Sequence, residues 1–281
     1  MTTATTGRTR PLAVPADRHR AGLAGTLRSE FTKIRSVRST YWTLFMLVVA
    51  SIAWSVAFCA GEASRWSHMA AQDRAGFDPT QSSVVGLALL GQLVIVVLGT
   101  LTITSEYSTG MIRTSLTVMP RRGVLYGAKA AVFAPVALVI ALLASFASFF
   151  LGQALMASTH AGATLSQPNV LRAVIGSALY VALCGLFAFG LGAILRSTAG
   201  AMTAAYGLLF LLPQLAKALP SAWYADVERW LPGGDVVVAI TGTQNGNNPQ
   251  LFSAWGEFAV FGAYTAILLI LGAVLFHKRD A

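Results

Sequence analysis

Between two long uncharged runs of the chain lies the polar segment SEYSTGMIRTSLTVMPRR, residues 105–122. Neither the run before it, Val84 to Thr104, nor the run after it, Ala130 to Met156, contains Asp, Glu, Lys or Arg. Each is about as long as the roughly 20 residues that a helix needs to cross a bilayer. We therefore expect residues 105–122 to form a loop at the membrane surface, and its arginines indicate the cytoplasmic side.

This segment also has an internal pattern. One apolar stripe repeats at helical spacing and is formed by Ile112, Leu116 and Met119. A short helix that starts near Thr109 would present this stripe on one face. Gly110 stands at its start, and Pro120 opposes its continuation. Such a helix, lying flat at the membrane surface, is suited to contact a cytosolic protein.

The composition sets the class of protein. Of 281 residues, 55% are hydrophobic and 11% are charged, whereas soluble proteins average about 25% charged residues. Because the charges are clustered and long uncharged windows remain, the sequence predicts an all-α polytopic membrane protein. The two cysteines, Cys59 and Cys184, are isolated in the sequence, which gives metal or redox chemistry little support.

The N-terminal part divides into a tail and an amphipathic helix. Residues 1–22 lack apolar periodicity, so we expect a disordered cytosolic tail, followed by one transmembrane domain over residues 23–281. An apolar stripe begins after the tail and is formed by Leu23, Leu27, Phe31 and Ile34. Lys33 and Arg35 lie on other faces, which is typical of an interfacial helix. The alternative is a basic flank that only fixes the topology.

Hydropathy predicts six membrane spans. They are placed at Tyr41–Ala60, Ser83–Thr104, Ala130–Met156, Val174–Leu195, Ala199–Leu219 and Phe258–Phe276. Pro135 in the third span and Pro213 in the fifth predict kinks. The link between the fourth and fifth spans is so short that these two helices must form a tight antiparallel hairpin.

The basic residues predict the orientation. If the N-terminus is inside, the cytosolic segments hold 15 of the 20 Lys and Arg residues. This bias, with an even number of spans, puts both termini in the cytosol. It also accounts for the net charge of +9 without a nucleic-acid partner. The external segment 220–257 holds the apolar run Val236 to Ile240, which is either a re-entrant element or a buried piece of loop.

The sequence carries no visible catalytic apparatus or energy source. The middle of each expected span is uncharged, whereas ion-coupled carriers place ionisable groups there. The chain has no GxxxxGK[ST] phosphate loop, no HExxH and no GxSxG. We therefore expect no enzyme activity and no cofactor in this chain, and a membrane body that is driven by a separate subunit.

At this point a family resemblance enters. Residues 105–116, followed by Met119-Pro120-Arg121-Arg122, resemble the acidic–(Tyr)–x–x–Gly–(Thr)–x–(Arg)…Pro–x–Arg signature of permease subunits of the type-2 (ABC-2-type) ABC exporters. The family carries this signature after the second of six spans. Met111 stands where the family often has Thr, which is a minor departure. The segment Leu27 to Arg35 resembles the interfacial helix of the same family.

The resemblance implies a mechanism and a set of partners. Two permease chains would pair in a bacterial cell membrane, and each would bind a separate cytosolic ABC ATPase that carries ATP and Mg²⁺. The helix after Thr109 would be the coupling helix. The implied coupling residues are Glu106, Tyr107, Gly110, Ile112, Arg113, Leu116, Met119, Pro120, Arg121 and Arg122, and the interfacial helix contributes Leu27, Phe31, Lys33, Ile34 and Arg35.

Glu106 is the single residue of greatest interest, because it lies where a span leaves the membrane. An ion pair with Arg113 or Arg121 would fix the angle of the loop, and the alternative is a solvated carboxylate at a helix end. Two other functions stay open at this point. One is a secondary carrier or channel that does not use ATP, and the other is a membrane scaffold that docks a cytosolic partner.

Overall fold

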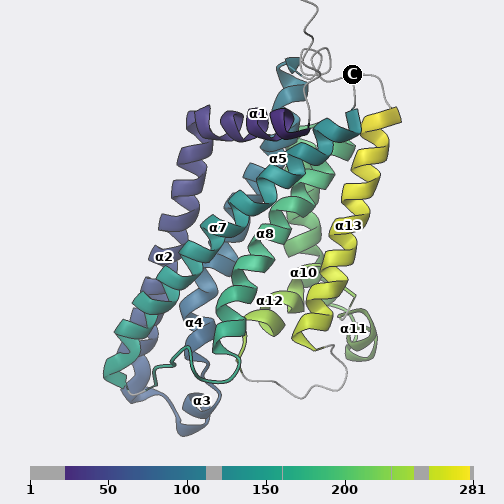
Figure 1. Ribbon diagram of the computed structural model, residues 1–281. Coiled ribbons are helices and arrows are strands. Elements are labelled where there is room, and N and C mark those ends of the chain that lie inside the picture. Colours follow the sequence, from purple (N-terminus) through teal and green to yellow (C-terminus); the bar gives the residue numbers. More distant parts are fainter. Residues whose placement is uncertain (1–22, 112–121, 160, 229, 244–252, 279–281) are drawn as a thin grey trace, which may run out of the picture.

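A computed structural model describes residues 23–111, 122–159, 161–228, 230–243 and 253–278 of the chain (Figure 1). All regular secondary structure in these ranges is helical, and six of the helices are long and apolar enough to cross a membrane. The predicted all-α class with six spans is therefore confirmed. The expected tail, residues 1–22, lies outside the described ranges.

Five of the six spans are longer than hydropathy alone predicted, whereas the fifth ends at Ala216 instead of Leu219. They comprise α2 (Arg38–Arg65), α4–η2–α5 (Pro79–Gly86, Leu87–Gly91, Gln92–Ser108), α7 (Arg122–Met156), α8 (Val170–Leu195), α9–η4–α10 (Thr198–Tyr206, Gly207–Leu211, Leu212–Ala216) and α13 (Ala254–Lys278). The third span differs most, because α7 begins at Arg122 instead of Ala130. Hydropathy locates the part of a helix that lies in hydrocarbon, whereas backbone hydrogen bonds continue the helix beyond it.

The structure describes the surroundings of Pro213 in the fifth span and the short link before that span. The π-helical turn η4 ends two residues before Pro213 and contains Leu209. Leu209 precedes the proline by four residues, and its carbonyl is the one that the proline ring would crowd in a regular α-helix. The helix α7 continues through Pro135. Between α8 and α9 only Arg196, at a φ of 53°, and Ser197, the N-cap of α9, lie outside helix. The tight hairpin is confirmed.

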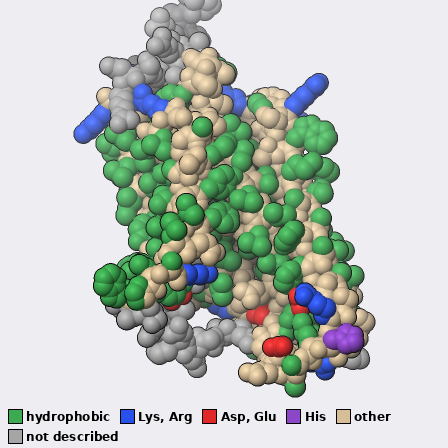
Figure 2. All heavy atoms as spheres, turned by 180° about the vertical axis from the view of Figure 1, so that it is seen from behind, with side chains coloured by type: hydrophobic (Ala, Val, Ile, Leu, Met, Phe, Trp, Pro, Cys, Tyr) green, Lys and Arg blue, Asp and Glu red, His purple; other side chains and the backbone are tan. Residues whose placement is uncertain are grey.

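The elements sort to the two ends of the bundle (Figure 1). Helix α1 (Leu23–Ser36) lies across one end, nearly at right angles to the spans, and α13 finishes at the same end. The short helices α3 (Ala71–Ala75), α11 (Ser221–Glu228) and α12 (Gly234–Thr241) lie at the other. Figure 2 shows a broad apolar surface between these two ends. The charged side chains gather toward the ends and leave this surface apolar. This is the pattern of a chain embedded in lipid.

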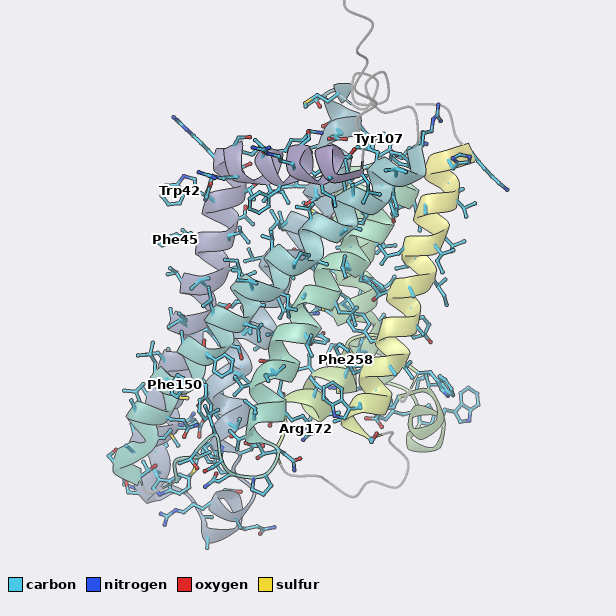
Figure 3. The ribbon with its side chains drawn as sticks, in the orientation of Figure 1. Trp42, Phe45, Tyr107, Phe150, Arg172 and Phe258 are labelled. Atoms are coloured by element: carbon cyan, nitrogen blue, oxygen red, sulfur yellow. The ribbon has the colours of Figure 1, made fainter. Side chains whose placement is uncertain are left out.

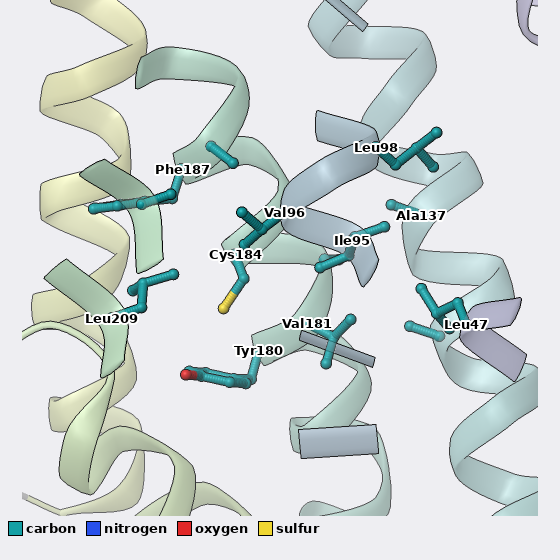
Figure 4. Close-up of a cluster of buried hydrophobic side chains, with 14 of the residues drawn as sticks. Leu47, Ile95, Val96, Leu98, Ala137, Tyr180, Val181, Cys184, Phe187 and Leu209 are labelled. Atoms are coloured by element: carbon teal, nitrogen blue, oxygen red, sulfur yellow. The ribbon is translucent and has the colours of Figure 1, made fainter. Parts of the chain in front are cut away.

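The core forms around α8, most of whose side chains are buried. It packs against α5, α7 and α13. Figure 4 shows part of this cluster, in which Tyr180 and Cys184 of α8 lie among side chains of α5 and Leu209 of η4. Both cysteines are buried, and neither forms a disulfide. At the start of the first span, Tyr41 and Trp42 are 52% and 63% exposed, and Trp42 lies close to the α1 end (Figure 3).

The apolar run Val236 to Ile240 forms most of α12, which is too short to span a membrane. Val236 and Ile240 are buried, and α12 packs against α8 and α13. Arg172 of α8 donates hydrogen bonds to the carbonyls of Ala239 and Gly242 at 3.4 and 2.7 Å (Figure 3). The run is therefore a helix that is tied into the bundle at the end opposite α1.

Candidate functional site

The segment that the sequence singled out leaves the bundle at the α1 end. Helix α5 ends at Ser108, and Thr109 caps it. Gly110 then takes a φ of +69°, the left-handed conformation that commonly ends a helix. The expected surface helix falls on residues 112–121, so Ile112, Arg113, Leu116, Met119, Pro120 and Arg121 lie outside the described residues. Met111 and Arg122 bracket this stretch, and Arg122 opens α7.

Glu106 lies in the last full turns of α5 and is buried, with an exposed fraction of only 6%. Its Oε1 accepts hydrogen bonds from Lys129 Nζ at 2.6 Å and from Lys33 Nζ at 3.0 Å. Glu106 is therefore no solvated carboxylate at a helix end. Its expected partners, Arg113 and Arg121, fall outside the described residues, and within the described part the bonds go to two lysines from other helices.

Glu30 of α1 completes a closed set of four side chains. Its Oε1 accepts from Lys33 Nζ at 2.8 Å, and its Oε2 accepts from Lys129 Nζ at 2.7 Å. We call Glu30, Lys33, Glu106 and Lys129 the ion cluster. Its formal charges, two positive and two negative, cancel. Because the members come from α1, α5 and α7, the cluster joins the helix that lies across the bundle to two of its spans.

Burial makes the ion cluster sensitive to the loss of any member. The Lys129 side chain is 2% exposed, and those of Glu30 and Glu106 are each 7% exposed. Removing charges from water costs several kcal/mol per ion, so a buried set is stable only when each charge is paired. Lys33 lies at the edge and is one-third exposed. Burial by itself would lower the pKa of Lys33, but its hydrogen bonds with Glu30 and Glu106 raise this pKa above the ordinary value.

Sequence reasoning selected half of the ion cluster. Glu106 and Lys33 were predicted as site residues, whereas Glu30 and Lys129 were not. A signal for both was present. Glu30 is the only acidic residue between Asp17 and Glu62, and Lys129 is the only charged residue between Arg122 and Arg172. An acidic residue within a basic segment and a lone lysine beside a long apolar run are candidates for a buried pair.

Tyr107 faces a different set of helices. Adjacent residues of a helix point about 100° apart, and the Tyr107 ring contacts Phe276 of α13 at a centroid distance of 6.3 Å. The guanidinium of Arg196, in the α8–α9 turn, lies 4.9 Å from the centre of the same ring. Two consecutive residues of α5 therefore contact different sets of residues: Glu106 binds charged side chains of α1 and α7, and Tyr107 contacts α13 and the α8–α9 turn.

The segment predicted to be an interfacial helix forms the helix α1. Its buried residues are Thr26 and Glu30, which lie on the side that packs against α7. Leu27, Lys33 and Ile34 are half-buried, whereas Phe31 and Arg35 are exposed. Glu30 thus fixes α1 to the protein through the ion cluster, and Phe31 of its apolar stripe stays exposed. This favours the interfacial helix over a merely basic flank.

Six apolar helices with an amphipathic helix across one end define a polytopic membrane protein. The family model described as ABC-2 family transporter protein matches residues 26–213, and the chain belongs to that family. The match includes all four members of the ion cluster and the whole segment 105–122. A search of curated proteins finds no match to this chain. The resemblance in the polar segment is confirmed, and the chain is a membrane component of a transporter.

Proposed function

We infer that this chain is the permease of an ATP-driven exporter in a bacterial cell membrane. It works as a dimer, with a second copy or a related chain, and both termini lie in the cytosol. Separate cytosolic ABC ATPase subunits bind ATP and Mg²⁺ and contact the segment 105–122. This assignment combines the family of the chain with the geometry of the α1 end.

The observation that carries the coupling role is the ion cluster. The segment that contains residues 112–121 follows the end of α5, which lies two residues after Glu106, and enters α7 seven residues before Lys129. Because Lys129 binds both Glu106 and Glu30, a displacement of this segment acts on α5, α7 and α1 together. The ion cluster thus gives the ATPase a rigid base on which to push.

The partner is tested by isolating the tagged chain from gently solubilised native membranes. We expect an ATP-binding-cassette subunit in near-stoichiometric amount, and its loss when Ile112 and Leu116 are both changed to Asp, because the apolar stripe supplies the packing. The matched control changes Ile267 and Ile270, which are 52% and 63% exposed on α13, to Ala. If no ATPase is recovered under conditions that preserve a known transporter complex, the assignment is wrong.

Sidedness gives a second prediction. A cysteine introduced at Ser115 is expected to react with a membrane-impermeant thiol reagent only after the membrane is opened. A cysteine at Ser67, at the other end of the bundle, is expected to react in intact cells. Cys59 and Cys184 are both buried, so they contribute little background. Labelling of the Ser115 variant in intact cells would show that the proposed orientation of the chain is wrong.

The exit of the chain from α5 gives a third prediction. Gly110→Val is expected to reduce transport-coupled ATP hydrolysis several-fold, because a left-handed backbone costs a side-chain-bearing residue about 1–2 kcal/mol. A Cβ at Gly110 would contact no described residue within 4 Å, so we ascribe the effect to backbone geometry. Gly110→Asn is the control, since Asn tolerates this conformation. Equal coupling in both variants would show that the backbone conformation at Gly110 has no role in coupling.

A further inference from the structure

Beside the ion cluster lies a pocket of about 400 Å³, which is within the size range of small-molecule sites. It is enclosed by α1, the start of α2, α5 and α7, and all four members of the ion cluster contribute to its wall. The pocket therefore adjoins the ion cluster, which joins α1 to the spans within the described part of the chain. The proposed coupling role does not require the pocket to be empty.

The wall of the pocket changes from polar to apolar along the bundle. Its apolar part is formed by Leu98, Leu101, Phe133 and Val136. Leu98 precedes Glu106 by eight residues and Val136 follows Lys129 by seven, so both lie about 10–12 Å further from the α1 end. A lipid in the leaflet next to α1 has the same order, with its head group at the interface and its chains deeper.

Several hydroxyls of the wall are already used as hydrogen-bond donors. The hydroxyls of Ser36, Thr43, Thr102 and Thr109 donate to backbone carbonyls three or four residues earlier in their own segments. Each lysine of the ion cluster directs two of its three N–H donors to the carboxylates. A bound molecule therefore meets the oxygens of these hydroxyls and the carboxylates, to which a polar group that carries hydrogen-bond donors can bind.

One acceptor is conspicuously unused. Glu106 Oε1 accepts from both lysines, whereas Glu106 Oε2 is buried and has no hydrogen-bond partner within the described part of the chain. A buried charged acceptor without a partner is costly, so a donor that reaches it gains more than an ordinary hydrogen bond. Glu106 also contributes to the wall of the pocket, and the terminal torsion of a Glu side chain is soft, so a rotation of its carboxylate can turn this oxygen toward a ligand.

We propose that this pocket binds the head group of an aminolipid from the leaflet next to α1, with the primary ammonium donating to the carboxylate of Glu106. The ion cluster is neutral in itself, so it offers no net positive charge to an anionic head group. A primary ammonium has three N–H donors, whereas a trimethylammonium of the same charge has none. This binding does not depend on transport or on an ATPase partner.

The test compares two lipids whose head groups differ only in that three methyl groups replace the three N–H donors of the ammonium. The full-length protein is purified in mild detergent, stripped of lipid and titrated with phosphatidylethanolamine or phosphatidylcholine of identical chains, and bound lipid is counted by native mass spectrometry. We expect about tenfold tighter binding of one phosphatidylethanolamine, which is the effect of about one charged hydrogen bond. Equal binding of the two lipids, or stronger binding of phosphatidylglycerol, would overturn the proposal.

Two matched variants locate the binding. Val136→Trp fills the apolar part of the pocket and is expected to abolish the preference for phosphatidylethanolamine. Val139→Trp, one turn further along α7, adds the same ring at a side chain that is 54% exposed and lies outside the pocket wall, and should keep the preference. Leu101→Trp fills the pocket from α5 and decides the question if Val136→Trp does not fold. A preference that survives in the pocket-filling variants places the lipid elsewhere and contradicts the proposal.

Discussion

Replacing Lys129 with methionine is expected to destabilise the protein by about 3–5 kcal/mol, the usual cost of breaking a buried ion pair by removing one partner. The Lys129 ammonium bonds both carboxylates of the ion cluster, at 2.6 Å to Glu106 and 2.7 Å to Glu30. Without it, two buried carboxylates share only Lys33, which lies at the edge. The loss of stability should lower the temperature at which the purified protein unfolds. Unfolding is measured as the fraction of protein that remains monodisperse after heating.

A second substitution distinguishes loss of pairing from loss of packing. Lys129→Met combined with Glu106→Gln leaves one carboxylate and one ammonium, Glu30 and Lys33, so the double variant is expected to be more stable than Lys129→Met alone. Lys278→Met, at an exposed position at the end of α13, is the control and should change nothing. If the effects of the two single changes simply add, the four side chains do not act as one unit.

Gly99→Leu is expected to prevent α5 from packing on α8. A Cβ at Gly99 would lie 2.1 Å from the carbonyl oxygen of Gly185, and that atom belongs to the backbone, which cannot rotate away. Overpacking of a core usually costs about 1–3 kcal/mol, and a clash between two helix backbones should exceed this range. Small residues commonly allow such close approach between membrane helices.

The matched control is Gly127→Leu in α7. Gly127 is exposed, and a Cβ there would meet nothing within 4 Å, so the same substitution should be tolerated. The measurement is the yield of protein that is extracted from the membrane and elutes as a single species. Normal yield of the Gly99→Leu variant would show that α5 and α8 are not held at the distance described.

The gross architecture was accessible from the sequence because it depends on local properties. A membrane span is set by length and hydropathy within about 20 residues, so all six spans were placed, although their ends were not. The helix α1 followed from the spacing of its apolar residues, and the α8–α9 hairpin from the short link around Arg196. The polar segment 105–122 carried the resemblance to the ABC-2 family, which the match over residues 26–213 confirms.

The tertiary structure alone decided which charges are partners. Glu30 and Lys129 are 99 residues apart in the chain, and Lys33 and Glu106 are 73 apart, so no local pattern relates them. They meet because α1 lies across the bundle where α5 and α7 reach its end. The pocket beside them has the same origin, since its wall is drawn from four helices. Hydropathy determines how often the chain crosses the membrane, but the pairing of buried charges depends on which helices become neighbours, and that is settled only when the spans pack.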